Sequence, residues 1–408
     1  MADIIVVGGG ASGMVASIVA ARRGMSVILL ERLNRIGKKL LVTGNGRCNL
    51  SNTCIESSYY HTSSDIDFSY PLKQVDFHLT QSFFEELGII PLIEEEKVYP
   101  FSEQASSVLD VLRMELEKCH VMTYTDTKIV DIYRTSDKWQ LLSEDGRTYS
   151  ASKVIFATGG MAGEGAYGCD DTGYHLLEKL GHTIVRPFPT LVHVLSKSPY
   201  CKMMKGTKIK CDTYAYTSNQ LIRKEYGEVL FTEDGLSGPP IFQLSRIAAK
   251  AKQDKRACKI SLDLLPHMSY EEVVSMIYSR IAAHPNRTVE ELFIGWLNKR
   301  MVMPIIKYAG LGSIHIPCEN LDYEDVSKLA KAIKQFEFET SGTRDYKYAQ
   351  ATAGGVKLEE IDFHTMASKK EQGLYLTGEV MDVDGDCGGY NLQWAWSTGY
   401  LAGLSASQ

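Results

Sequence analysis

Residues 4–13 read IIVVGGGASG, an apolar run that leads directly into a glycine-rich turn. Residues 14–23 continue as a predicted helix, which Gly24 ends. A second apolar run, SVILL at 26–30, predicts another buried strand. Strand, turn, helix and strand fit within about 30 residues, the size of a βαβ unit. The stretch therefore predicts an α/β fold of the Rossmann type.

Three glycines of this turn, Gly8, Gly10 and Gly13, stand at the spacing GxGxxG. In a dinucleotide-binding unit the first permits the tight turn and the second lets the backbone approach a pyrophosphate. The third lets helix and strand pack closely, and the helix N-terminus offers unpaired amides to the phosphates. Glu31 ends the second strand, where a carboxylate that accepts from ribose hydroxyls is expected. The pattern predicts dinucleotide binding, and a purely structural glycine turn is the alternative.

A second glycine-rich segment, 378–392, opens a helix predicted at about 391–404. An NAD dehydrogenase usually continues with further βα units. Here an irregular segment follows at 33–71, and residues 128–149 alternate like a β-meander. A helix N-terminus can stabilise negative charge on a reduced flavin ring. The two glycine-rich segments therefore predict noncovalent FAD rather than NAD. NAD(P)H is a possible electron donor, but without a second GxGxxG it would dock without a dinucleotide-binding fold of its own.

The pattern of the sequence changes at about residue 188 and again at about 346. Residues 1–187 and 346–408 are predicted to form one FAD-binding domain, α/β and Rossmann-like, interrupted by an inserted domain at 188–345. The expected elements of the insert are barrel strands at about 188–245 and 310–345 and a helical cap at about 265–310. Further expected elements are helices at 74–87, 105–118 and 172–180, a strand at 153–160, capping boxes at 269–272 and 288–291, and a helix begun by Asp322.

The composition narrows the function classes. The 408 residues carry 44 basic and 50 acidic side chains, a formal net charge of −6. A protein that binds nucleic acid by neutralising phosphates is usually basic, so no nucleic-acid partner is expected. The nine cysteines are scattered and include no CxxC, which indicates reduced thiols in a cytoplasmic protein. We expect no membrane span, targeting segment or metal site; the expected partner is a small-molecule substrate, and the oligomeric state is left open.

Four further segments are highly specific: LLVTGNGRCNLSN at 40–52, FTEDGLSGP at 231–239, ATAGGV at 351–356 and GGYNLQWAW at 388–396. Through them the chain resembles a family of FAD-dependent oxidoreductases. Its members are variously labelled aminoacetone-oxidase-like flavoproteins or bile-acid dienone reductases. The segments span the whole chain in the family's order. The resemblance implies an FAD domain formed by both ends of the chain, with an inserted β-barrel and helical cap.

The resemblance also implies which residues lie along FAD: Glu31, Arg32, Lys38, Lys39, Arg47, Cys48, Asn49, Thr158, Asp382, Tyr390, Asn391 and Leu392. The glycine-rich turns and strand ends complete the predicted cofactor-binding set with Gly8, Gly10, Ala11, Ser12, Gly13, Gly46, Val130, Ala157, Gly159, Gly378, Glu379 and Gly389. We expect the flavin ring between residues 46–49 and 386–391, with the insert closing over its exposed face.

Arg47, Asn49 and Tyr390 are the predicted catalytic residues. Arg47 offers a fixed positive charge, and Asn49 offers both donors and acceptors, so either could orient flavin or substrate. The alternative is that both merely tie their loop to the phosphates. Three histidines could act as a general acid, although a lone histidine is more often structural or on the surface: His61, His193 and His364.

The expected reaction is hydride transfer between flavin N5 and a small organic substrate. By resemblance, the acceptor is a C=C bond conjugated to a ketone, as in a steroid or bile-acid-like enone. His193 and Glu233 stand where the family usually shows proline and histidine, and both lie in the insert, so they bear on the substrate. Oxidation of a small amine or aminoketone with O2 is an alternative. Alternatives of another class are an RNA-modifying flavoprotein and a flavin-binding protein without turnover.

Overall fold

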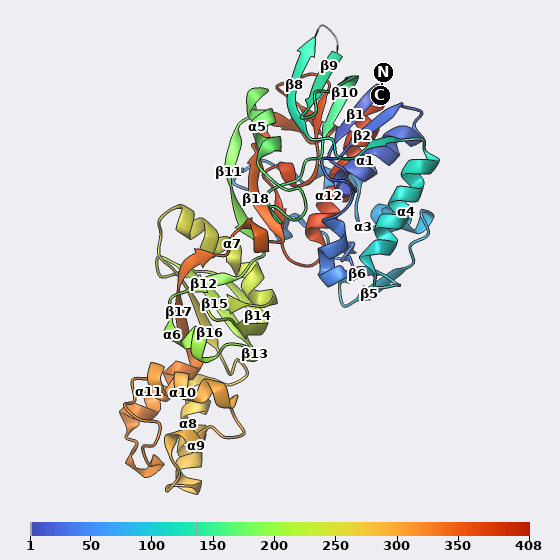
Figure 1. The fold of residues 1–408 in the computed structure, drawn as a ribbon. Coiled ribbons are helices and arrows are strands. Elements are labelled where there is room, and N and C mark those ends of the chain that lie inside the picture. The colour runs from blue at the N-terminus through green and yellow to red at the C-terminus, as the bar shows by residue number, and fades with distance from the viewer. Residues whose placement is uncertain (1, 136–137) are drawn as a thin grey trace. The chain divides into compact units, whose positions relative to one another are not determined.

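The computed structural model describes residues 2–135 and 138–408 (Figure 1). The chain divides into two compact units. The first consists of Met1–Pro189 and Tyr346–Gln408, and the second is the continuous segment Thr190–Asp345. The first unit is therefore assembled from residues that lie at opposite ends of the sequence.

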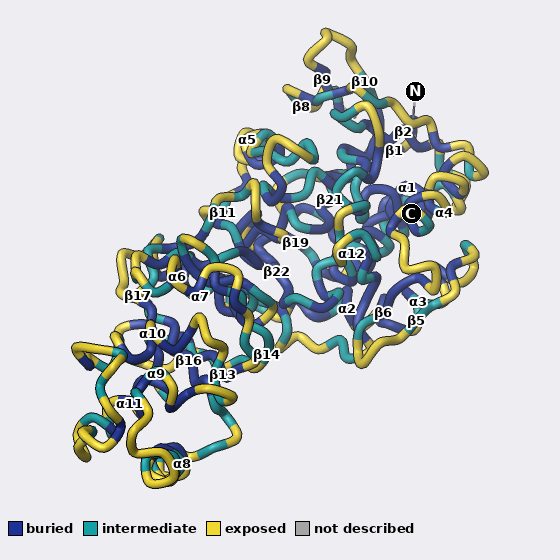
Figure 2. The backbone as a smooth tube through the Cα atoms, turned by 60° about the horizontal axis from the view of Figure 1, so that its bottom comes forward, coloured by how far each residue is buried: buried dark blue, intermediate teal, exposed yellow. Residues whose placement is uncertain are grey.

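The first unit is built on a mixed sheet whose centre is parallel. Strand β1 (Ala2–Val7) lies between β2 (Val27–Leu30) and β10 (Thr148–Phe156). Strand β7 (Met122–Tyr124) extends the sheet beyond β2, and β21 (Leu374–Leu376) extends it beyond β10. Parallel strands covered on both faces consist of apolar runs, and β1 and β2 are almost entirely buried (Figure 2). The predicted α/β, Rossmann-like fold is confirmed.

One strand serves two parts of this sheet. The first half of β10 pairs antiparallel with β9 (Lys138–Ser143), which in turn pairs with β8 (Ile129–Thr135), as the meander prediction required. The second half of β10 pairs parallel with β1 and β21. The meander and the buried strand predicted separately at 153–160 are thus joined, because β10 runs without a break through both pairings.

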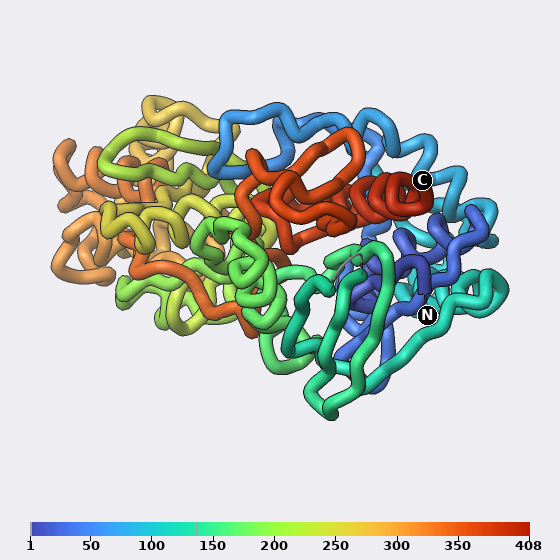
Figure 3. The backbone as a smooth tube through the Cα atoms, turned by 90° about the horizontal axis from the view of Figure 1, so that it is seen from above, coloured from blue at the N-terminus to red at the C-terminus, as the bar shows by residue number. Residues whose placement is uncertain are grey.

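The last helix of the chain packs against the first. Helix α12 (Tyr390–Ala406) lies along α1 (Ala11–Arg22) (Figures 1 and 3). A Cβ on Gly399 would lie 2.4 Å from the carbonyl oxygen of Ser12, and a Cβ on Gly403 would clash with α1 in the same way. Only glycine permits such close approach, which fixes α12 beside the glycine turn. The other helices of this unit are α2 (Tyr70–Gln74), α3 (Phe77–Glu86), α4 (Ala105–Lys118) and α5 (Thr172–Lys179).

The second unit contains a closed barrel in the strand order β12-β15-β14-β13-β16-β17. The strands are β12 (Val194–Ser196), β13 (Lys208–Thr217), β14 (Gln220–Phe231), β15 (Gly235–Ser237), β16 (Cys258–Asp263) and β17 (Phe336–Thr343). Its helices are α6 (Pro199–Met203), α7 (Pro239–Gln253), α8 (Tyr270–Ala283), α9 (Val289–Leu292), α10 (Lys299–Tyr308) and α11 (Tyr323–Lys334). Within the described residues, no helix has both the length and the apolar character needed to cross a membrane.

The element boundaries predicted for the insert are partly wrong. Helix α7 begins at Pro239, a residue suited to the first turn of a helix, inside the range assigned to strands. Barrel strand β16 lies between the two predicted strand ranges. The helix predicted to begin at Asp322 is present as α11, which lies within the range 310–345 assigned to strands; Asp322 caps it by accepting from the amide of Asp325. Both predicted capping boxes are present, at the starts of α8 and α9.

Candidate cofactor-binding site

The glycine turn after β1 has the geometry that its sequence predicts. Gly8 has φ +107°, and a Cβ there would lie 2.3 Å from the carbonyl oxygen of Ala157. A Cβ on Gly13 would lie 2.0 Å from the carbonyl oxygen of Gly8, so helix and strand touch through backbone atoms. Gly10 differs, because its φ is −81° and no atom lies within 4 Å of the position of a Cβ. Any side chain at Gly10 would enter open space above the turn.

That open space belongs to a cleft in the first unit. At one end, which we call the β1–α1 end, it is lined by the glycine turn, Glu31 and Arg32. At the other, the α12 end, it is lined by Asn391, Leu392 and Ala395. The predicted cofactor residues on its lining are Gly8, Gly10, Ala11, Ser12, Glu31, Arg32, Lys38, Lys39, Ala157, Thr158, Gly159, Glu379, Asn391 and Leu392.

Glu31 is fixed by the backbone on both sides. Its Oε2 accepts from the amide of Gly9 at 2.9 Å, and its Oε1 accepts from the amide of Leu33 at 2.8 Å. Burial raises the pKa of Glu31, and these two hydrogen bonds oppose the shift. Each carboxylate oxygen has a second lone pair. Glu31 can therefore accept from a further donor in the cleft while it keeps both amides.

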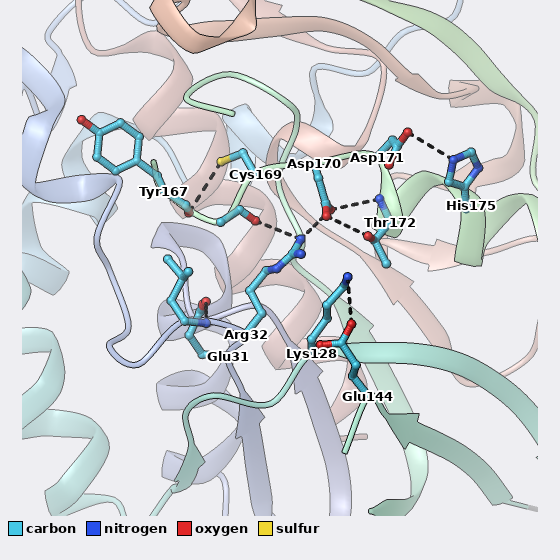
Figure 4. Close-up of polar contacts among 12 residues, drawn as sticks. Glu31, Arg32, Lys128, Glu144, Tyr167, Cys169, Asp170, Asp171, Thr172 and His175 are labelled. Carbon is cyan, nitrogen blue, oxygen red and sulfur yellow. Dashed lines mark hydrogen bonds and ion pairs between the residues drawn. The ribbon is translucent and has the colours of Figure 1, made fainter. Parts of the chain in front are cut away.

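Arg32 connects the cleft to the loop before α5. Its Nη1 lies 2.5 Å from Oδ1 of Asp170 and donates to the carbonyl of Gly168 at 3.2 Å (Figure 4). Asp170 also accepts from the amide and the hydroxyl of Thr172, at 3.0 and 2.9 Å. These contacts fix the loop that supplies Tyr167 and Gly168 to the cleft lining. The neighbouring Asp171 faces His175 instead, away from Arg32 (Figure 4).

Several cations line the cleft. The Nζ of Lys39 lies 2.7 Å from Oε2 of Glu379, whose Oε1 accepts from the amide of Thr352 at 2.6 Å. Arg35 and Lys38 also line the cleft. This excess of positive charge on the lining suits a pyrophosphate.

The α12 end is held together by contacts between distant parts of the chain. The side-chain Nδ2 of Asn391 donates to the carbonyl of Gly385 at 2.8 Å, and its Oδ1 accepts from the backbone amide of Gly385 at 2.9 Å. The Asn49 amide, oriented to satisfy its neighbours, donates to the carbonyl of Ser51 and accepts from the amide of Gly389. A Cβ on Gly389 would lie 2.3 Å from the carbonyl oxygen of Ser51. Segments 46–51 and 385–391 thus meet directly, with no gap for a ring between Asn49 and Gly389.

None of the three predicted catalytic residues lies on the cleft lining. The Arg47 guanidinium lies 4.0 Å above the ring of Tyr99 and pairs with Glu94 and Glu103. Tyr390 stacks on Tyr59 with 4.6 Å between ring centroids, and burial raises its pKa. Asn49 ties two backbone segments together, as described above. Each has a structural task in this arrangement, and its catalytic role stays a prediction.

The other predicted cofactor residues away from the lining serve packing or turns. Cys48 is buried, and burial raises the pKa of its thiol to about 12. Asp382 accepts from Thr62 and Ser63, and Val130 is 39% exposed on β8. The remaining ones are four glycines. Gly13 and Gly389 make close backbone contacts, Gly378 lies against the side chain of Ser12, and Gly46 has a positive φ. Several lining residues belong to no sequence motif and were not predicted, among them Thr127, Lys128, Cys169, Asp170 and Gln350.

The residues of the cleft fit FAD. Cβ atoms on Gly10 or Gly159 would meet nothing within 4 Å, so the backbone is bare where a phosphate would approach. The buried hydroxyl of Thr158 has no hydrogen-bond partner within the protein, and it lines the cleft. The lining includes an acid beside the glycine turn, several cations and the first turn of α12, residue types that suit the ribose, the pyrophosphate and the flavin. Among the described residues, no cluster of His, Cys, Asp and Glu could hold a metal ion.

Residues 2–405 match the profile of the HI0933-like protein Rossmann domain family. The chain belongs to this family. Its membership confirms the predicted flavoprotein oxidoreductase with FAD as the cofactor. The family resemblance found through the glycine-rich and GRCN segments is confirmed as well.

Two relatives match over nearly their whole length. The 3-dehydro-bile acid delta(4,6)-reductase of Clostridium scindens is 38% identical, with 100% of both chains covered. The ribosomal RNA dihydrouridine synthase of Escherichia coli is 28% identical, with 98% of this chain and 96% of the relative covered. Among solved structures, a flavocytochrome c3 fumarate reductase in its open conformation aligns with a TM-score of 0.49 and 16% identity. That alignment covers 100% of this chain and 78% of the other.

Proposed function

We propose that this FAD oxidoreductase reduces a C=C bond conjugated to a ketone, with a steroid-like or bile-acid-like enone as substrate and NAD(P)H as electron donor. The observation that carries the proposal is the 38% identity, over the full chain, to a reductase named for 3-dehydro bile acids with 4,6 double bonds. The name of the second relative describes saturation of the uracil C5=C6 bond, which is also conjugated to a carbonyl. The two substrates differ, but the reaction class is the same.

In this proposal the residues of the cleft divide the binding of FAD among them. Glu31 accepts from the adenosine ribose, and the amides at the start of α1 face the pyrophosphate together with Lys38 and Lys39. The N-terminus of α12, a helix of 17 residues, supplies the positive end of its dipole to the ring. When bound and reduced, FAD supplies the hydride, so the protein contributes position, charge and a proton.

A nucleic-acid substrate is the second candidate, supported by the RNA-modifying relative. The charge is also distributed unevenly between the units. Residues 190–345 contain 22 lysines and arginines against 18 aspartates and glutamates, although the whole chain has a net charge of −6. A basic insert could attract a polyanion even in an acidic protein.

The test is to reduce the flavin of the purified protein without oxygen, first with NADH or NADPH and then, as a donor-independent route, with light. The reduced protein is mixed with cyclohex-2-enone, a 3-oxo-4-ene steroid, or a uridine-rich ribosomal RNA fragment. We expect rapid return of the oxidised-flavin spectrum with the steroid and a product saturated at the conjugated bond. Reoxidation by RNA alone would favour the second candidate. The proposal would be contradicted if none of the three compounds reoxidised the flavin and small amines reduced the oxidised flavin.

A further inference from the structure

His61 lies on a short strand beside the α12 end of the cleft. Strand β4 (Tyr60–His61) pairs antiparallel with β22 (Asp384–Gly385), and His61 is in register with Asp384. Gly385 is also the residue that Asn391 contacts through both its amide nitrogen and its oxygen. Asn391 lines the cleft. The strand of His61 therefore pairs with β22, and β22 is hydrogen-bonded to a residue of the cleft lining.

The ring of His61 is held by a buried carboxylate. Its Nε2 lies 2.7 Å from Oδ1 of Asp386, whose side chain is 5% exposed. The His61 side chain is 26% exposed, so the dyad is buried at the aspartate and open at the histidine. Asp386 is itself fixed by its amide, which donates to the carbonyl of Tyr59 at 2.9 Å. A fixed carboxylate that orients an accessible imidazole is the arrangement of a general acid–base pair.

Two other histidines of the first unit, His182 and His175, lack this combination. His182 is fully buried between Glu360 and Ser368, 2.9 and 2.8 Å away, and its ring has no path to a ligand. His175 is two-thirds exposed and contacts Asp171 and Glu178 on its own helix. His61 alone among these joins an accessible ring, a buried carboxylate and a position next to a cleft-lining turn.

We propose that His61 is the proton donor of the reaction and Asp386 its positioning residue, an inference that rests on the enone reduction proposed above. The β carbon of the substrate accepts a hydride, and the two electrons come from reduced FAD, which ends oxidised. The α carbon accepts the proton of the His61 Nδ1–H bond, so the C=C π bond is lost and two C–H bonds form. His61 ends neutral and regains its proton from solvent.

The first experiment measures reoxidation of the photoreduced holoenzyme by cyclohex-2-enone in His61→Gln. General acid catalysis contributes about 100- to 10,000-fold, so reoxidation by the enone should slow by that factor. Reoxidation by ferricyanide, which needs no proton on carbon, should keep its rate, as should FAD content. His175→Gln is the matched control, since that histidine also contacts two carboxylates, and it should react like the wild type. In His61→Ala, added imidazole should restore part of the rate.

The second measurement does not depend on turnover. In oxidised holoenzyme labelled with ¹⁵N-histidine, cyclohex-2-enone should shift the ring resonances of His61 and leave those of His175 in place. Asp386→Asn should lower the rate of reoxidation by the enone without loss of FAD. Equal enone rates in wild type and His61→Gln would overturn the inference while the enone reduction stands. A wild type that no enone reoxidises would overturn both.

Discussion

The two ends of the cleft are built from different kinds of contact. At the β1–α1 end, Gly8, Gly10, Gly13 and Glu31 lie within one βαβ unit, and local backbone geometry places them. At the α12 end, the contacts join residues that are hundreds of positions apart, such as His61 with Asp386. The first end is formed by local backbone geometry, which suits the nucleotide half of a cofactor. The second is assembled by tertiary structure, which suits the part of the site where reactivity and substrate are determined.

Gly10→Val should have the largest effect, and it should act on binding without unfolding the protein. Gly10 has an ordinary φ, and its Cβ position is empty, so the added atoms occupy only cleft space. Overpacking costs about 1–3 kcal/mol, and here the displaced group is a phosphate, so FAD should bind up to about 150-fold more weakly. Calorimetric titration of the apoprotein with FAD measures this.

Gly312→Val is the control for that variant, because Gly312 also has an empty Cβ position and no positive φ but lies in the second unit. It should leave FAD affinity unchanged. If Gly10→Val bound FAD as tightly as Gly312→Val, the pyrophosphate would not lie over the glycine turn.

Glu31→Ala should weaken FAD binding about 10- to 100-fold, since a hydrogen bond to a charged group contributes about 1.5–3 kcal/mol. It should also lower the melting temperature, because the amides of Gly9 and Leu33 lose their acceptor. Glu144→Ala removes a carboxylate that is 66% exposed and paired with Lys128, and it should change neither quantity. A loss of stability with unchanged FAD affinity would assign Glu31 to the turn alone.

Asn391→Ala tests whether the α12 end controls reactivity rather than affinity. The variant loses the two contacts with Gly385, each worth about 1 kcal/mol. We expect FAD affinity to change less than in Glu31→Ala, and reoxidation by cyclohex-2-enone to slow by about tenfold. Stopped-flow absorbance measures the rate. The opposite order, a larger loss of affinity than of rate, would mean that the two ends do not divide binding and reactivity.

Asp170→Asn should have the smallest effect. The Arg32–Asp170 ion pair is about 30% exposed on both sides, and such pairs contribute at most about 1 kcal/mol. FAD should dissociate up to about fivefold faster, and the difference should shrink at high salt. Asp171→Asn is the adjacent control, since Asp171 faces His175. Fluorescence of released FAD follows both variants.

The sequence predicted the β1–α1 end well because strand, turn and helix there follow from adjacent residues. The family resemblance also implied Asn391 and Leu392, and both line the cleft. The sequence did not predict that Arg47 would contact Tyr99, Glu94 and Glu103, because these residues belong to no recognisable motif. In the insert, α7 was not predicted because it follows directly on strand-like sequence. Strand β16 was not predicted because it lies between two helical segments. Strand β16 is determined by long-range pairing with β13 and β17, which a single sequence does not reveal.

The central claim is the direction in which FAD lies along the cleft, and a crystal structure of the FAD-loaded protein tests it most directly. The account predicts ribose hydroxyls within about 3.2 Å of the Glu31 carboxylate and the flavin ring against the first turn of α12 at Asn391 and Leu392. It would be contradicted by a flavin ring at the glycine turn after β1, or by one bound outside the cleft beside Arg47.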